Sequence, residues 1–354
     1  MLLVLTACGS PFTPVYDDSL LVDSVQAPTG TDSMPAASDQ SEAEQSGAAP
    51  AGSKALLRCA LSGDNWSVEY EALTQISMLL SEETGGRCSL ELYPGAVLGE
   101  EEDTLQMLSE GSLELCVVGN TALSSVCEDF SILSAPYVFE SLEEQERFYE
   151  TGDLSALFKA PADSGFTVLR AWSAGSCCIF TRAAPISVPE DLAGMNLGAL
   201  EKDLSVSPLS LMGGNTIGVR AQDFCPALQI GSIDGAESDL VSYMALEYWT
   251  VAPYYNNTSH RFLTNELVIS NSSLEALSAE DQDVLLRLLQ RMPSICHNLL
   301  QSRIADCESI AEACGVVITE VNRQAFQSLC EAELDRIADR TELTRRIYDE
   351  ILSF

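Results

Sequence analysis

The stretch that decides the fold is ALQIGSIDGAES, residues 227–238, taken together with PISVPEDLAG, residues 185–194. The first has the pattern of a helix that ends at Gly231, followed by a short apolar step and a second turn at Asp234. The second combines a turn with a short helix whose first turn contains Pro189. Neither stretch carries catalytic chemistry, so both describe architecture rather than a reaction.

The chain on the N-terminal side of these stretches alternates strand and helix patterns. Apolar residues within 66–83 recur at the spacing of one helix face, and Gly85 follows as a stop. A second helix begins with the acidic run 100–103, where negative charge suits the N-terminal end of the helix dipole. Strand patterns flank these helices at residues 55–62, 88–94 and 113–120. This alternation predicts an α/β fold with parallel strands covered by helices.

The second half of the chain contains further strands and then becomes helical. A helix is predicted near residues 141–158, and strand patterns follow at 166–172, 177–182 and 195–200. A long helical pattern starts after Ser278 and continues to about Cys314, where Gly315 should end it. Pro293 predicts a kink inside this helix, which at about 1.5 Å per residue would exceed one small domain.

Composition excludes several classes of function. The chain has 354 residues, enough for two domains, and a formal net charge of −35 with 46% hydrophobic residues. The only lysines are Lys54, Lys159 and Lys202, so nucleic-acid binding is not expected. Two histidines occur, and we find no Ser/His/Asp order, phosphate loop or metal motif. The sequence therefore predicts a binding protein with no cofactor and no metal, and not an enzyme.

The first ten residues, MLLVLTACGS, resemble a bacterial lipobox in which Cys8 is lipidated. We interpret residues 1–10 as the remnant of a lipoprotein signal, with a stray apolar N-terminus as the alternative. Residues 11–53 contain no Lys or Arg and are expected to form a disordered acidic stalk. No other apolar run reaches the roughly 18 residues of a membrane span. The prediction is an extracytoplasmic protein tethered to the membrane by lipid.

The cysteine pattern does not indicate a disulfide framework or a zinc site. Twelve cysteines occur, and removing Cys8 leaves eleven, an odd number. No CxxC pair and no Cys/His group with zinc spacing is present. Most of these cysteines are therefore expected to serve as small core residues.

Several motifs together resemble one family, the solute-binding receptors of tripartite ATP-independent periplasmic (TRAP) transporters, of the DctP type. They are, in chain order, PGAVLGEEEDTLQMLSEGSLEL (94–115), LSAPYVFESLEE (133–144), PISVPEDLAGMNL (185–197), LMGGNTIGV (211–219), ALQIGSIDGAES (227–238), EYWTVAPYYNNTSH (247–260) and LSAEDQDVL (277–285). The resemblance covers nearly all of residues 54–345.

The resemblance implies a two-lobed fold like that of type II periplasmic binding proteins, joined by crossing strands and a long C-terminal helix. Lobe I would comprise residues 54–175 and 264–303, and lobe II residues 176–263 and 304–354. The ligand, a small organic solute, would bind between the lobes and pass to the membrane subunits of a TRAP permease. A receptor subunit that senses a ligand for a signalling partner is the alternative, because folds host many functions.

Three positions depart from the family pattern at the expected ligand site. The resemblance implies arginines at Gly198 and Cys178 and an asparagine at Ser238. Arginine holds a carboxylate through a fork of donors, which glycine and cysteine cannot provide. We therefore expect an altered ligand, although Arg182 or Arg220 could instead replace the missing cation.

Four further residues are candidates for the ligand cleft. Glu237 would favour a cationic or hydroxyl-bearing ligand, or would only stabilise a turn. His260 would face the cleft, or would hydrogen-bond the hinge from behind. Trp66 and Trp172 would line an apolar wall, with core packing as the alternative for each.

Overall fold

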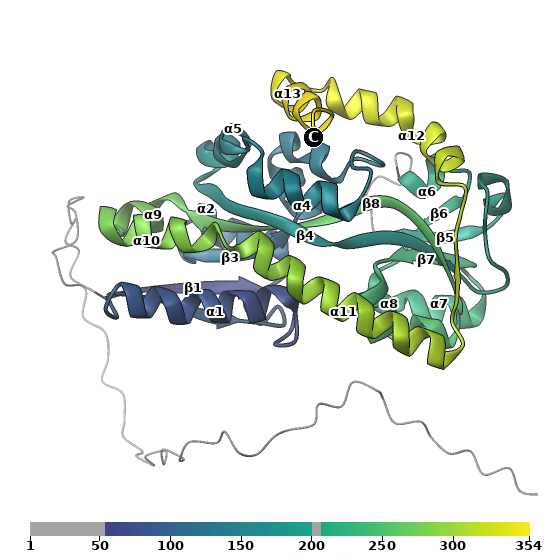
Figure 1. Ribbon diagram of the computed structural model, residues 1–354, viewed down its shortest axis with the longest axis horizontal. Helices are drawn as coiled ribbons and strands as arrows, with labels where there is room; N and C mark the ends of the chain where they lie inside the picture. Colours follow the sequence, from purple (N-terminus) through teal and green to yellow (C-terminus); the bar gives the residue numbers. More distant parts are fainter. Residues whose placement is uncertain (1–53, 200–206) are drawn as a thin grey trace, which may run out of the picture. The chain divides into compact units, whose positions relative to one another are not determined.

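The computed structural model describes residues 54–199 and 207–354, which are built around one mixed sheet (Figure 1). Its strand order is β2-β1-β3-β8-β4-β7-β5-β6, with β9 paired to β8. The strands are β1 Ala55–Leu61, β2 Cys88–Tyr93, β3 Leu115–Gly119, β4 Phe166–Thr181, β5 Asn196–Ala199, β6 Asn215–Gly218, β7 Gly235–Ser238, β8 Tyr254–Ser270 and β9 Val317–Thr319. Parallel pairs at both ends of the sheet thus flank a central antiparallel pair, β8 and β4.

The helices cover this sheet as the sequence predicts. They are α1 Val68–Glu83, α2 Glu101–Ser109, α3 Asn120–Val126, α4 Leu142–Thr151, α5 Ser155–Lys159, α6 Pro208–Leu211, α7 Phe224–Ile230, α8 Leu240–Ala245, α9 Asn271–Ala276, α10 Ala279–Leu289, α11 Met292–Cys314, α12 Arg323–Ala338 and α13 Glu342–Ile351. Short 3₁₀ turns are η2 Glu128–Ser134, η3 Ala160–Ser164, η4 Pro189–Leu192, η6 Ala221–Asp223 and η7 Tyr248–Thr250. Among the described residues, no helix combines the length and the apolar character that crossing a membrane requires.

Local sequence explains why α1 begins and ends where it does. The Ser67 hydroxyl accepts a hydrogen bond from the amide of Tyr70, which caps the first turn. Leu73, Ile76 and Leu80 lie on one face and are fully buried. Gly85 follows with φ of +61°, a left-handed conformation that glycine adopts without strain.

The long C-terminal helix is two helices, which corrects the predicted single kinked helix. Helix α10 ends at Leu289, and α11 begins at Met292 with Pro293 in its first turn. Proline is tolerated there because the amides of the first turn have no partner inside the helix. The prediction of Gly315 as the stop is confirmed, since it adopts φ of +78° after Cys314.

The two short strands predicted at 166–172 and 177–182 are one strand, β4, of 16 residues. The small residues between them, SAGS, read as a loop in sequence. In the structure this segment stays paired with β8 through register shifts at Ser173/Gly175 and Cys177/Ile179. Bulges let a strand bend without losing its partner, so β4 and β8 run the whole length of the sheet.

Buried apolar residues form four clusters, and two helices join the clusters at the two ends of the sheet. Helix α11 contributes Cys296 and Leu300 to the clusters beside β1–β3 and Cys307 to the cluster beside β7. Helix α12 contributes Leu334 to one of the clusters beside β1–β3 and Phe326 to the cluster beside β5. Figure 1 shows α11 running from α1 at one end to α7 and α8 at the other. The predicted α/β fold, with crossing strands and a spanning helix, is confirmed.

Helix α13 departs from the lobe assignment made from sequence. Ile347 and Ile351 belong to the cluster that contains residues of β3 and α4, at the lobe I end of the sheet. The ring of Phe354 packs edge-on against Phe148 of α4, with 5.4 Å between their centroids. The chain therefore returns to the first end of the sheet after α12, whereas residues 304–354 were assigned to lobe II.

The cysteines between Cys59 and Cys330 are all free thiols. Eight of these eleven are buried, so the expectation that most serve as small core residues is confirmed. Cys8 and the predicted stalk at 11–53 lie outside the described residues.

Candidate ligand-binding site

The two crossing strands distort at the middle of the sheet. Gly175 of β4 has φ of +117°, and Ser259 of β8 has φ of +40°. A Cβ atom at Gly175 would lie 3.2 Å from the Cβ of Asp239, so this close approach also favours glycine. The irregular backbone places neighbouring residues of β4 and β8 in two cavities and in one buried cluster.

The first cavity, here called the Cys178 cavity, has a volume of about 380 Å³. Its floor is the middle of β4 and β8, with Cys178 and Tyr255 among the residues that line it. Asp239 and Leu300 close it from the start of α8 and from α11. A volume of this size falls within the range of small-molecule sites.

The second cavity, the Trp172 cavity, has a volume of about 340 Å³. Trp172 and Asn265 form its floor on β4 and β8. Asp64 and Glu69 line it from the loop after β1 and the start of α1, and Arg303 lines it from α11. Both cavities share Asp239, Val241 and Leu300, so they adjoin each other beside α11 and the start of α8.

Carboxylates outnumber cations around the Cys178 cavity. Four acidic side chains line it: Glu140, Asp239, Glu308 and Glu320. Among the described lining residues the one cation is Arg323, whose Nη1 lies 2.8 Å from the Glu140 carboxylate. Its Nη2 donates to the carbonyl of Phe139 at 3.0 Å, so this guanidinium is already engaged.

The Trp172 cavity has the same imbalance. Asp64, Glu69 and Asp239 line it against one arginine from the described part of the chain, Arg303. The Arg303 guanidinium lies 3.1 Å from Glu71, outside the cavity lining. Burial raises the pKa of both Glu69 and Asp239, because desolvation disfavours a charged carboxylate. A cation or a hydrogen-bond donor would therefore be better accommodated here than a second anion.

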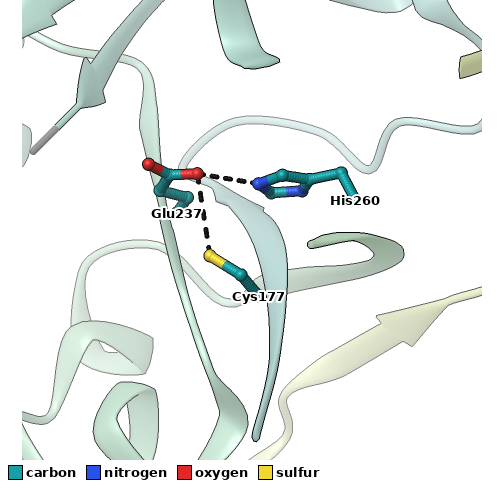
Figure 2. Close-up of side chains that lie close together, drawn as sticks. All are labelled: Cys177, Glu237 and His260. Atoms are coloured by element: carbon teal, nitrogen blue, oxygen red, sulfur yellow. Dashed lines mark hydrogen bonds and ion pairs between the residues drawn. The ribbon is translucent and has the colours of Figure 1, made fainter. Parts of the chain in front are cut away.

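A buried cluster lies beside the cavities and joins three strands. Cys177 of β4, Glu237 of β7 and His260 of β8 are each at most 3% exposed. Figure 2 shows the thiol and the imidazole both pointing at the same carboxylate oxygen of Glu237. His260 Nε2 lies 2.7 Å from Glu237 Oε2, and Cys177 Sγ lies 3.6 Å from it.

Other side chains hold this cluster in place. Arg261 Nη2 donates to Glu237 Oε1 at 2.8 Å, so the buried carboxylate has a cationic partner. His260 Nδ1 lies 2.9 Å from Thr258 Oγ1, which itself accepts from the amide of Ile179. Burial raises the pKa of the Cys177 thiol well above its ordinary value.

The two predicted residues Glu237 and His260 line neither cavity. Glu237 was predicted to favour a cationic or hydroxyl-bearing ligand, because the family arginines are absent at Cys178 and Gly198. Arg261 Nη2 donates to its carboxylate and His260 Nε2 lies within hydrogen-bond distance of it, so the described contacts already engage Glu237 and its role toward a ligand stays a prediction. These contacts favour the alternative interpretations, a structural carboxylate and a histidine that hydrogen-bonds the hinge, and both roles stay predictions.

The three positions that depart from the family pattern lie close together but differ in surroundings. Cys178 lines its cavity, where Sγ is 3.8 Å from Ser259 Oγ. Ser238 pairs in register with Cys178, and its carbonyl accepts from the Tyr255 hydroxyl at 3.2 Å. Gly198 of β5 faces a core residue, since a Cβ there would lie 2.8 Å from the ring of Phe224.

The remaining predicted residues divide between the second cavity and the surface. Trp172 is 1% exposed and lines the second cavity. Trp66 is 55% exposed and is not among the lining residues. Arg182 lies 3.4 Å from Asp234, and Arg220 lies 2.9 Å from Asp223, so both candidate replacement cations pair with carboxylates away from the cavities.

Sequence reasoning missed the residues that matter most in the buried cluster. Cys177 and Arg261 stand next to Cys178 and His260, which were singled out. In a regular strand, neighbouring side chains point to opposite faces of the sheet. The bulges at the middle of β4 and β8 interrupt this alternation, and their positions cannot be predicted from the sequence. Asp239 and Glu69 were missed because acidic residues are common in this chain.

Sequence comparison places the chain among receptors. The profile of the bacterial extracellular solute-binding proteins, family 7, matches residues 62–341. A solute-binding protein of Chromohalobacter salexigens is 27% identical over 283 residues, which cover 79% of this chain and 84% of the relative. The C4-dicarboxylate-binding periplasmic protein DctP of Vibrio cholerae is 24% identical over 258 residues, covering 72% and 77%.

Structural comparison agrees with this result. A TRAP periplasmic solute-binding protein from Chromohalobacter salexigens, solved with bound D-glucuronate, matches with a TM-score of 0.77. The match covers 83% of this chain and 98% of that protein at 24% sequence identity. At this identity the likeness shows the fold.

Proposed function

Because this chain belongs to family 7 of the bacterial extracellular solute-binding proteins and is a TRAP-type receptor that captures a small organic solute, we propose that its solute carries hydroxyl or amine groups rather than a simple carboxylate. One observation carries this proposal: carboxylates outnumber cations in both cavities, and the described lining arginines are already ion-paired. The solute would bind in these cavities and then pass to the permease.

The electrostatic argument compares this chain with relatives that bind acids. One relative is named for C4-dicarboxylates, and one similar structure holds D-glucuronate. An anion buried beside Asp239 and Glu69 would need a cation to offset its lost hydration. Neither Cys178 nor Gly198 supplies one. An ammonium group would instead gain from these carboxylates, and hydroxyl groups would donate to them.

Calorimetric titration of the full chain with three panels tests the proposal. The panels are mono- and dicarboxylates, neutral polyols and sugars, and small amines. We expect measurable binding only from the second or third panel. Micromolar binding of a simple organic acid, about −8 kcal/mol, would show that another cation anchors the ligand and would refute the proposal.

Two substitutions distinguish the cavities once a binding compound is found. Glu69→Gln removes a charge from the Trp172 cavity, and Glu308→Gln removes one from the Cys178 cavity. The substitution in the occupied cavity should weaken an amine by about tenfold, or 1.4 kcal/mol, because a charge-assisted hydrogen bond is lost. Glu82→Gln, at an exposed position of α1, is the matched control and should change nothing.

We also propose that the solute is released unchanged, because the family consists of solute-binding proteins. Mass spectrometry of the bound compound, before and after long incubation with the protein, should show no product. A new compound that forms only with the folded protein would indicate an enzyme.

Lipid attachment at Cys8 completes the proposal and is our first prediction. The segment LTAC resembles a lipobox, and lipid would keep the receptor near its permease. Cys8→Ser should move the protein from the membrane fraction to the soluble fraction of the producing cells. Cys59→Ser, at a buried thiol of the folded part, is the control and should leave fractionation unchanged. If the Cys8 variant stays with the membrane, another feature anchors the chain.

A further inference from the structure

We propose that Cys177, Glu237 and His260 form a binding site for one transition-metal ion of the Zn²⁺ class, which would tie β4, β7 and β8 together. The three donor atoms lie within 4.8 Å of one another, and all three side chains are buried. The site is separate from both cavities and does not depend on which solute the receptor takes.

The donor spacing is close to that of a tetrahedral zinc site. Zn–S bonds of about 2.3 Å and Zn–N or Zn–O bonds of about 2.0–2.2 Å place the donors about 3.3–3.6 Å apart. The observed Sγ–Oε2 distance of 3.6 Å already meets this requirement. The Nε2–Oε2 distance of 2.7 Å would have to open by about 0.6 Å. The Sγ and Nε2 atoms lie within 4.8 Å of each other and would also have to settle into this range.

The chemistry of the donors selects the class of ion. A thiolate and an imidazole together suit Zn²⁺, Co²⁺ or Cu²⁺, whereas Mg²⁺ and Ca²⁺ prefer oxygen ligands alone. Cys177 and His260 supply the sulfur and nitrogen, and Glu237 supplies one oxygen. Three protein ligands leave the fourth tetrahedral position to a water molecule.

Neighbouring groups already hold these ligands in the manner of a metal site. Thr258 Oγ1 lies 2.9 Å from His260 Nδ1 and can accept a hydrogen bond from Nδ1–H, which leaves the Nε2 lone pair for the metal. Arg261 binds Glu237 Oε1, so Oε2 remains the oxygen that faces His260 and Cys177. Metal-bound histidines and carboxylates are commonly oriented by such outer hydrogen bonds.

Binding involves a defined movement of protons. Without metal, the Cys177 thiol donates to Glu237 Oε2, and in the tautomer protonated at Nε2 His260 donates to the same oxygen. On binding, the thiol proton leaves to solvent and the imidazole proton moves to Nδ1, where it donates to Thr258. The cation then faces one thiolate and one carboxylate, which together balance its charge. Arg261, 11% exposed at its side chain, adds a mostly buried positive charge beside the site, which solvent screens little and which opposes the binding of a cation.

Cobalt titration of the full chain tests the proposal, because thiolate ligation of Co²⁺ produces a strong charge-transfer absorption. The protein is stripped with a chelator and refolded from urea with Co²⁺ present, so that burial cannot prevent access. We expect one Co²⁺ per chain with a thiolate band that Zn²⁺ bleaches. Cys177→Ser should abolish the band and weaken binding at least tenfold. Cys178→Ser, whose thiol lies in the cavity, is the matched control and should keep both.

Two results would overturn the proposal. One is refolded wild-type protein that shows no thiolate band with Co²⁺ and no change in Tm with Zn²⁺, which would leave the cluster a hydrogen-bond network alone. The other is a band that survives Cys177→Ser and disappears in the Cys178 variant. If Cys177→Ser fails to fold by circular dichroism, X-ray absorption of the zinc-loaded wild type decides. One sulfur neighbour at about 2.3 Å with nitrogen and oxygen neighbours supports the site, and only nitrogen and oxygen neighbours refute it.

Discussion

At the scale of single residues, Gly198 shows how a departure from a family pattern depends on its surroundings. The family pattern has an arginine at this position, where this chain has a glycine. The structure adds that the space is occupied, because a Cβ at Gly198 would lie 2.8 Å from Phe224 and 3.1 Å from Ile233. The ring of Phe224 therefore occupies the space that the first atoms of a longer side chain at position 198 would need.

We expect Gly198→Arg to destabilise the protein instead of restoring an acid site. Overpacking a core typically costs about 1–3 kcal/mol, and Phe224→Ala should cost about 3–5 kcal/mol by leaving a cavity. The double variant should lose less than the sum, because the arginine stem can fill the space left by the ring. Urea denaturation measures all three, with Ala193→Arg at a nearby exposed position as the control. Strict additivity would mean that the two side chains do not compete.

Glu266 is a buried carboxyl group whose two oxygens have no hydrogen-bond partner among residues 54–199 and 207–354. Burial, with a smaller contribution from Glu101, raises its pKa well above the ordinary value of 4.5. The folded protein thus keeps a proton that the unfolded chain releases above about pH 4.5. In that range the native state binds more protons, so stability falls as the pH rises, by at most about 1.4 kcal/mol per pH unit.

Replacing Glu266 by Gln should remove this dependence. We expect Glu266→Gln to raise Tm at pH 8 by several degrees and to change it little at pH 4, since about 1 kcal/mol corresponds to about 2–4 °C in a protein of this size. Glu275→Gln, at an exposed position of α9, controls for loss of charge. An equal change at both pH values would mean that folding does not raise the pKa of Glu266.

At the scale of elements, the sequence predicts most helices and strands because their signals are local. Apolar spacing defines α1, and glycines in left-handed conformations end α1 and α11. The continuity of β4 could not be predicted, because its middle is held only by pairing with β8, a strand about 90 residues later in the chain. The candidate site was predicted less well for the same reason: bulges decide which of Cys177 and Cys178 faces the cavity.

Helix α13 tests how strongly the C-terminus is attached to the rest of the protein. Ile347 is fully buried in the cluster beside α4, whereas Leu352, just after the helix, is 67% exposed. Ile347→Ala should lower the free energy of unfolding by about 2–5 kcal/mol through the cavity it leaves. Leu352→Ala should change it by less than about 0.5 kcal/mol. Similar effects from both variants in urea would show that α13 does not pack as described.

At the scale of the whole molecule, acidity and architecture together constrain what the receptor does. The net charge of −35 means that the surface repels other anions. The two cavities also carry more carboxylates than cations among their described lining residues. Helices α11 and α12 each pack on both ends of the sheet, so the ends cannot move apart without bending these elements. We therefore expect any closure over a solute to be a rotation about the middle of β4 and β8 that also bends these helices.

Our last prediction concerns this closure. Gly175 and Ser259 already have left-handed backbones at the register shifts, and hinges are a few residues that absorb changes in φ and ψ. Small-angle scattering with the tightest compound from the titration panels, at saturation, should give a smaller radius of gyration than protein alone. A panel compound that does not bind is the control. Gly175→Ala should weaken binding, because a Cβ would meet Asp239 at 3.2 Å in a conformation that alanine avoids. Identical scattering with and without the bound compound would mean that the two ends of the sheet are held rigidly and that the solute enters a preformed cavity.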